Sequence, residues 1–269
     1  MSSTPKSSWL LRLHVGLVYL FLYAPVIVLV IFSFNSDQRN ASWQGFTCKW
    51  YYHLLQNEAV QRALFNSLKV GLSSTLLATT IGSMAALALA RYTVPAKKLV
   101  GFLVFLPLVI PEIVMGISIL TLYLSLHIPL SIYTVIFAHV AFCIAYVTIT
   151  VRSRLAGIDP CLEEAAADLG ATRWETFCLV TLPQMLPGLL SGALLSFTLS
   201  FDDFVITFFN AGVGSGTLPM AIHSMIRFGI TPEINAISTI MLAISLTIMV
   251  AMQLYEYRQN QRELAKQQQ

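Results

Sequence analysis

Six long apolar segments constrain the fold of this chain more than any other feature of its sequence. A helix needs roughly 20 apolar residues to cross a hydrocarbon core about 30 Å thick. Hydrophobic residues make up 56% of the 269 positions and charged residues only 11%, a composition typical of membrane proteins. The predicted spans lie at approximately 13–34, 66–90, 99–124, 130–151, 184–209 and 234–255. The sequence therefore predicts an all-α, polytopic transmembrane helical bundle with six spans, in which residues 1–269 form a single domain.

The first of these segments lies where a signal peptide would lie, but it is longer than one. Its apolar run, VGLVYLFLYAPVIVLVIFSF, exceeds the roughly 7–15 residues of a signal-peptide core, and no small-residue cleavage site follows it. We therefore expect a retained transmembrane helix.

Lysine and arginine are divided unevenly between the two sides of the predicted membrane, and cytoplasmic loops normally carry the excess. With a cytoplasmic N-terminus, the inner side holds Lys6, Arg12, Arg91, Lys97, Lys98, Arg152, Arg154, Arg173, Arg258, Arg262 and Lys266. The outer side then holds Arg39, Lys49, Arg62, Lys69 and Arg227. We expect both termini to be cytoplasmic and the largest inner loop to lie at about 152–183.

Catalytic, metal-binding and nucleotide-binding patterns are absent from the sequence. The cysteines Cys48, Cys143, Cys161 and Cys178 are scattered and the five histidines are dispersed, so no metal-ligand spacing occurs. The chain has no phosphate-binding loop, no G-x-S-x-G and no H-E-x-x-H. No basic stripe with interleaved aromatic residues suggests nucleic acid. We expect a chain that is not an enzyme, with no cofactor and no metal.

The inner loop begins with signals for a short helix. Asp159 is a favourable N-cap, Pro160 suits the first helical position, and Glu163 and Glu164 complement the positive end of the helix dipole. Gly170 is the expected left-handed stop.

A second short helix is predicted directly after this stop. Thr172 and Glu175 have the spacing of a capping box, and Pro183 is expected to end the helix before the fifth span. The helix pair can be read as a connector resting on the bundle. It can also be a docking element for a cytosolic partner, because a loop that merely joins two spans needs only a few residues.

The sequence EAAADLGATRWETFCLVTLP resembles the EAA motif of ABC importer permeases. The matching positions are Glu164, Ala165, Ala166, Gly170, Leu182 and Pro183. The segments YAPVIVLVIFSFNS, WQGFTCKWY, SFTLSFDDFVI and TPEINAISTIML extend the resemblance over nearly the whole chain. They are similar to segments of the permease subunits of bacterial spermidine/putrescine importers.

This resemblance implies a type I ABC importer permease in a bacterial cytoplasmic membrane. It implies two ATPase subunits, a second homologous permease, a periplasmic or extracellular polyamine-binding protein and a polyamine substrate. Carried onto this chain, Gly170, Ala171 and Thr172 would form the turn that docks on an ATPase. Glu164 would brace the preceding helix, which also carries Ala165 and Ala166.

Carboxylates inside predicted spans are candidates for the substrate path, because a charge in a membrane is costly unless it has a function. Glu112 lies fourteen residues past Lys98, which is about 21 Å along a helix, and it follows Pro107 and Pro111, which can break that helix. It could line the path, or it could be a buried partner of an arginine or histidine in another subunit.

Asp202 and Asp203 form a second acidic candidate near the outer end of the fifth span. Carboxylates suit an amine-bearing ligand because charge-assisted hydrogen bonds to ammonium groups are strong. The two side chains point about 100° apart on a helix, so one or both could face the path. An interfacial pair exposed to water is the alternative.

Two questions stay open at this point. Trp43, Trp50, Tyr51 and Tyr52 in the outer loop could form an interfacial aromatic belt or contact the delivery protein. The chain could also serve an importer of another small solute. A secondary transporter or channel for organic cations would explain the carboxylates, but not the EAA-like loop.

Overall fold

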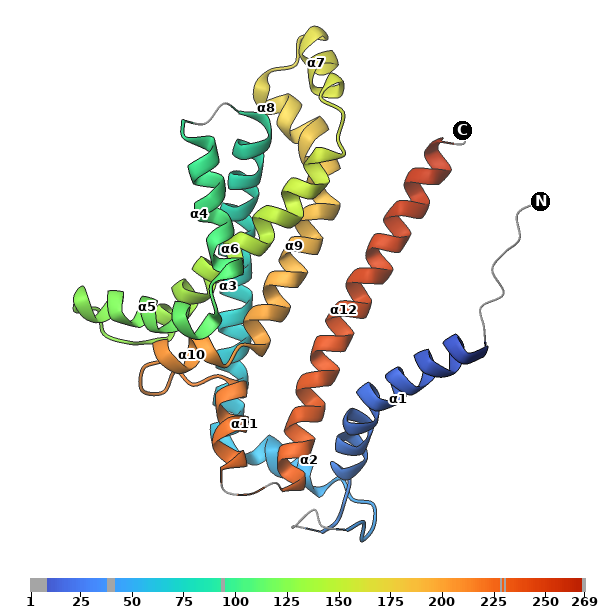
Figure 1. Ribbon diagram of the computed structural model, residues 1–269, viewed down its shortest axis with the longest axis vertical. Coiled ribbons are helices and arrows are strands. Elements are labelled where there is room, and N and C mark those ends of the chain that lie inside the picture. The colour runs from blue at the N-terminus through green and yellow to red at the C-terminus, as the bar shows by residue number, and fades with distance from the viewer. Residues whose placement is uncertain (1–8, 38–41, 93–94, 228, 230, 268–269) are drawn as a thin grey trace. The chain divides into compact units, whose positions relative to one another are not determined.

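The computed structural model describes residues 9–37, 42–92, 95–227, 229 and 231–267 (Figure 1). Lys6 and Arg39, which enter the charge count above, lie outside these residues. The described residues are helical, apart from connecting segments and one isolated bridge between Asn35 and Phe46. The expected all-α class is confirmed.

The helices, in chain order, are α1 (Trp9–Phe32), α2 (Lys49–Gln56), α3 (Glu58–Arg91), α4 (Lys97–Val109), α5 (Glu112–Ser125), α6 (Ile132–Ala156), α7 (Cys161–Asp168), α8 (Arg173–Thr176), the π-helix η1 (Phe177–Thr181), α9 (Leu182–Asp202), α10 (Val205–Asn210), α11 (Leu218–Ile226) and α12 (Pro232–Gln267). Five helical stretches are long and apolar enough to cross a membrane: Leu11–Phe32, Glu58–Arg91, Ile132–Ala156, Arg173–Asp202 and Pro232–Tyr255. The pair α4 and α5 passes the same test together, although the two helices are bent by 113°. The described residues therefore contain up to six candidate spans.

Contacts divide the chain into two compact units. Residues 1–61 and 222–244 form the first, and residues 62–221 and 245–269 form the second.

In the first unit, Asn35 organises the loop between α1 and α2. Its side-chain amide donates to the Ser42 carbonyl oxygen at 2.7 Å and accepts from the Gln44 amide at 3.0 Å. The indole N–H of Trp50 donates to the Asn35 carbonyl oxygen at 2.7 Å. The hydroxyl groups of Tyr51 and Ser33 are hydrogen bonded to each other at 2.7 Å.

The four aromatic residues predicted at this outer loop differ in exposure. Trp50 and Tyr51 stabilise the loop through these hydrogen bonds, whereas Trp43 and Tyr52 are exposed.

In the second unit, the most buried helix is α6. Small residues let its neighbours approach closely, which is the usual basis of helix packing in membranes. A Cβ atom on Gly188 of α9 would lie 2.7 Å from the Cβ of Arg154, and one on Gly82 of α3 would lie 2.9 Å from Val147. Replacing either glycine would push α6 away from its neighbours.

The predicted span 99–124 is not one straight helix. Ile110, which precedes Pro111, is extended with ψ 129°, and the chain turns between α4 and α5. Proline has no N–H to continue a helix and disfavours helical geometry in the residue before it. Glu112 therefore begins a new helix instead of lying in the middle of one.

The predicted span 184–209 also differs from the structure at both ends. The second short helix, α8, continues through η1 into α9, so Pro183 does not separate it from the span. The wide turn includes a bond from the Leu182 amide to the Phe177 carbonyl oxygen, five residues back. At the other end, Asp203 is extended with ψ 130°, so α9 stops at Asp202 and α10 begins at Val205.

Candidate functional site

The first candidate site is the turn between α7 and α8. Gly170 has φ +88°, a conformation that side chains other than glycine disfavour. The Gly170 amide donates to the Ala167 carbonyl oxygen at 2.9 Å and the Ala171 amide to that of Ala166 at 3.0 Å. These two bonds form a Schellman motif, which ends α7 abruptly.

The capping box at the start of α8 fixes the other side of this turn. The Thr172 amide donates to Glu175 Oε2 at 2.8 Å, and the Glu175 amide donates to Thr172 Oγ1 at 3.3 Å. At the start of α7, Asp159 accepts the Cys161 amide at 3.0 Å. The Gly170 stop and the capping box lie where they were predicted, whereas α7 begins at Cys161, one residue later than predicted, with Pro160 as its N-cap.

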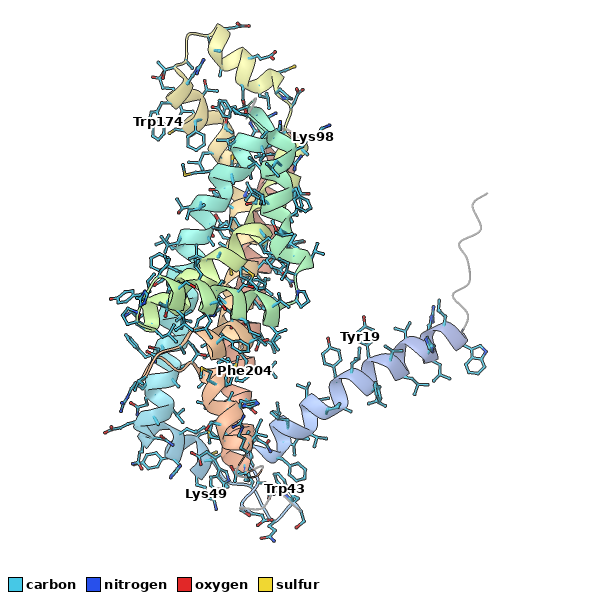
Figure 2. The ribbon with its side chains drawn as sticks, turned by 60° about the vertical axis from the view of Figure 1, so that its left-hand side comes forward. Tyr19, Trp43, Lys49, Lys98, Trp174 and Phe204 are labelled. Atoms are coloured by element: carbon cyan, nitrogen blue, oxygen red, sulfur yellow. The ribbon has the colours of Figure 1, made fainter. Side chains whose placement is uncertain are left out.

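The turn presents an exposed surface at one end of the second unit. Leu169 is 90% exposed, Leu179 74% and Trp174 71%. Figure 2 shows Trp174 toward the same end of this unit as Lys98 and away from Phe204. Of the residues matched to the EAA motif, Glu164, Ala165 and Gly170 are exposed and Ala166 is half-buried. Large apolar side chains exposed together suit a protein partner.

Glu163, which directly precedes the predicted Glu164, makes contacts that hold this helix pair. Glu163 Oε1 lies 3.2 Å from Arg91 Nε and accepts the Thr181 hydroxyl at 3.1 Å. Arg91 Nη2 also donates to the Ile158 carbonyl oxygen at 3.3 Å. Arg91 therefore joins the end of α3 to the loop before α7 and, through Glu163, to η1. From the sequence alone, Arg91 was predicted only to be an inner-side charge.

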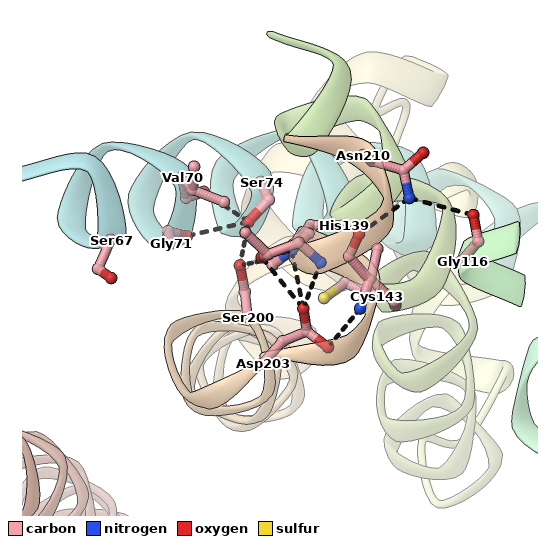
Figure 3. A network of polar contacts seen from close by, with 12 residues as sticks. Ser67, Val70, Gly71, Ser74, Gly116, His139, Cys143, Ser200, Asp203 and Asn210 are labelled. Carbon is pink, nitrogen blue, oxygen red and sulfur yellow. Dashed lines mark hydrogen bonds and ion pairs between the residues drawn. The ribbon is translucent and has the colours of Figure 1, made fainter. Parts of the chain in front are cut away.

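The second candidate site is a buried polar network that joins four helices (Figure 3). His139 of α6 is hydrogen bonded through Nδ1 to Ser200 of α9 at 2.7 Å and through Nε2 to Thr207 of α10 at 2.9 Å. Ser200 is bonded in turn to Ser74 of α3 at 2.8 Å. His139 Nε2 also lies 3.3 Å from Asp203 Oδ2. His139 was not among the predicted site residues, although an ionisable residue within a predicted span is a signal in itself.

The three predicted acidic residues have different surroundings. Asp203 is 9% exposed, and its carboxylate accepts the backbone amides of Ile206 at 3.2 Å and Thr207 at 2.9 Å. Asp202 and Glu112 are exposed. The structure therefore does not give the two neighbouring aspartates equivalent positions.

The helices that follow the two breaks pack on each other within the second unit. Asn210 at the end of α10 donates its side-chain amide to the Gly116 carbonyl oxygen of α5 at 3.2 Å. A Cβ atom on Gly116 would lie 3.0 Å from the Phe209 ring. The segments that begin near Glu112 and near Asp203 are therefore held together.

Residues 78–264 match the family model described as the binding-protein-dependent transport system inner membrane component. The chain belongs to this family. It is therefore a multi-pass component of the inner membrane and a transport subunit rather than an enzyme. The permease is 42% identical over 237 residues to the spermidine/putrescine transport system permease protein PotC of Escherichia coli K12, covering 88% of this chain and 90% of the relative. It is 41% identical over 231 residues to the putrescine transport system permease protein PotI of the same organism, covering 83% of this chain and 82% of the relative.

Solved structures place the permease in the same fold as ABC importer membrane subunits. One chain of a bacterial ABC transporter involved in the import of the acidic polysaccharide alginate matches with a TM-score of 0.71 at 18% identity, covering 94% of this chain and 96% of that chain. A chain of the alginate transporter in complex with a pentasaccharide-bound periplasmic protein matches with a TM-score of 0.66 at 19% identity, covering 96% of both chains. The predicted ABC importer permease fold is thus confirmed.

Proposed function

We propose that this permease is the membrane-spanning subunit of an ABC transporter that imports polyamines across the cytoplasmic membrane. The observation that carries the proposal is the 42% identity to a spermidine/putrescine permease over 88% of the chain. Spermidine and putrescine are both candidate substrates, because the relatives include permeases named for both amines and for putrescine alone.

The proposed complex contains a second homologous permease, two ATPase subunits and a polyamine-binding protein on the outer side. The α7–α8 turn, with Gly170, Ala171 and Thr172 at its tip, would dock on an ATPase, and Ala165, Ala166 and Glu164 would line its α7 side. The exposed Trp174 and Leu169 support this assignment, because an isolated connector has no need of such side chains at its surface. The positive-inside bias supports cytoplasmic termini.

Transport would proceed by alternating access driven by the ATPases. Glu112 and Asp202 would face the path, because they are exposed carboxylates in an otherwise apolar part of the chain. Ammonium groups would replace part of their water shell with charge-assisted hydrogen bonds to these carboxylates. The third acidic residue, Asp203, is buried.

Uptake by the complete complex tests this function. The permease, co-expressed with its partner subunits and reconstituted in vesicles, is expected to take up radiolabelled spermidine or putrescine only with ATP inside and binding protein outside. Unlabelled polyamines should compete, and neutral solutes should not. Uptake that follows an ion gradient without ATP would identify a secondary transporter, and ATP-dependent uptake of another solute class alone would refute the polyamine assignment.

The Arg91 and Glu163 pair provides a prediction about coupling. We expect Arg91→Glu or Glu163→Arg to lower ATP-driven uptake about fivefold, because losing a partly buried ion pair that holds the helix pair costs about 1 kcal/mol. The charge-swapped double variant should recover part of that loss. Lys98→Glu, at a nearby exposed cation, is the matched control and should leave uptake unchanged. Equal uptake in the single and double variants would argue against the brace.

A further inference from the structure

The break between α9 and α10 lies in an apolar part of the chain and leaves backbone amides that α9 does not satisfy. Unsatisfied backbone amides are costly inside a membrane unless another group accepts a hydrogen bond from them. The Asp203 carboxylate accepts the amides of Ile206 at 3.2 Å and Thr207 at 2.9 Å. Asp203 thus acts as the cap of the first turn of α10, and its oxygens are already engaged within the chain.

A buried carboxylate also needs a partner for its charge. His139 Nε2 lies 3.3 Å from Asp203 Oδ2, and the side chains are 1% and 4% exposed. The Thr207 hydroxyl donates to Asp203 Oδ2 at 3.1 Å. A carboxylate can only accept hydrogen bonds, and the Thr207 hydroxyl already donates its one proton to Asp203. The His139 Nε2 atom must therefore be protonated, so that it can donate to Thr207 and Asp203.

His139 is itself held from its other ring nitrogen. Ser200 lies 2.7 Å from Nδ1 and is bonded to Ser74, whose hydroxyl also donates to the Val70 carbonyl oxygen at 2.7 Å. The ring therefore ties α3, α6 and α9 to the start of α10, as Figure 3 shows. His139 and Asp203 therefore meet at the point where the chain leaves α9.

Asp202 is the last residue of α9 and directly precedes this turn. Successive residues of a helix point about 100° apart, so drawing Asp203 into the interior turns Asp202 outward. Asp202 is exposed on the surface of this chain. If that surface faced lipid, the charge of the carboxylate would be costly. A water-filled path that carries a cation would meet this requirement.

We propose that the neighbouring aspartates have separate roles: Asp202 binds an ammonium group of the substrate, while the buried His139 and Asp203 pair positions Asp202 by fixing the break between α9 and α10. This proposal rests on the proposed polyamine transport. It makes His139 a positioning residue, which acts on the substrate only through Asp202.

Uptake kinetics of the reconstituted complex, with spermidine and putrescine as probes, test this division. Asp202→Asn is expected to raise the KM for uptake about tenfold, because a hydrogen bond to a charged group is lost, with an unchanged melting temperature. Asp202→Glu should recover part of the affinity. His139→Leu should raise KM and lower the melting temperature, whereas His139→Gln, which retains a donor and an acceptor, should stay closer to the wild type.

The double variant of Asp202→Asn and His139→Leu is the decisive measurement. If His139 acts through Asp202, the double variant has the KM of Asp202→Asn alone; contacts that act independently would multiply the two effects. Multiplied effects, or a His139→Leu variant that loses thermal stability at wild-type KM, would overturn the positioning role. A raised KM in Asp203→Asn with wild-type KM in Asp202→Asn would reverse the assignment. If the wild-type complex takes up no polyamine, the proposed function itself is wrong.

Discussion

Replacing Gly170 with aspartate is expected to abolish the stimulation of ATP hydrolysis by loaded binding protein, reducing it at least about tenfold. The left-handed backbone at φ +88° costs a residue with a side chain roughly 1 kcal/mol or more. A Cβ atom at this position would have no atom of the described residues within 4 Å beyond its own chain neighbours. The added carboxylate would therefore project into the space that a docked ATPase must occupy. ATPase assays on the reconstituted complex measure this effect.

Two control variants separate docking from backbone strain. Gly170→Ala adds the same strain with the smallest side chain, and it should retain more stimulation than Gly170→Asp. Gly157→Asp introduces the same charge at another glycine of the inner loop, where φ is −91° and an added Cβ makes only an ordinary contact. It should behave as the wild type. Normal stimulation in the Gly170→Asp complex would show that this turn does not dock.

Replacing Glu112 with glutamine is expected to lower the rate of spermidine uptake about tenfold while the complex still assembles. The change removes a charge from the first residue of α5 but keeps its size, and a charge-assisted hydrogen bond is worth about 1.5–3 kcal/mol. Uptake of radiolabelled spermidine and copurification of the partner subunits are the two measurements.

Glu112→Asp is the matched control because it keeps the charge on a shorter side chain. It should retain more uptake than Glu112→Gln. If the glutamine variant transports at the wild-type rate, Glu112 does not line the path. If the glutamine variant fails to copurify with its partner subunits, the alternative is favoured, in which Glu112 is the structural partner of an arginine or histidine in another subunit.

The candidate membrane spans and the inner helix pair could be predicted from the sequence because their causes are local. Apolar length identifies a membrane-spanning helix without any knowledge of its neighbours. The left-handed Gly170 and the bond between the Glu175 amide and Thr172 depend on residues at most a few positions apart. The candidate docking turn was recognisable for the same reason.

The helix breaks were only partly accessible in this way. Pro111 was visible as a possible break, but a window of about 20 residues averages over the two positions where α4 ends and α5 begins. The break after Asp202 has no proline at all. At this break the Asp203 carboxylate accepts hydrogen bonds from two backbone amides of α10. The apolar run of the sequence does not show these bonds, so it indicated one continuous span.

The sequence by itself determined the membrane class, the family resemblance and the geometry of the α7–α8 turn, because each follows from composition or from neighbours along the chain. The tertiary structure decided that Glu163 braces the loop and that Asp203 is buried while Asp202 is exposed. These assignments depend on partners far away in sequence: Glu163 pairs with Arg91 of α3, and Asp203 pairs with His139 of α6. Adjacent residues of the same type receive different roles when packing brings a distant partner to one of them, and no local pattern encodes which one that is.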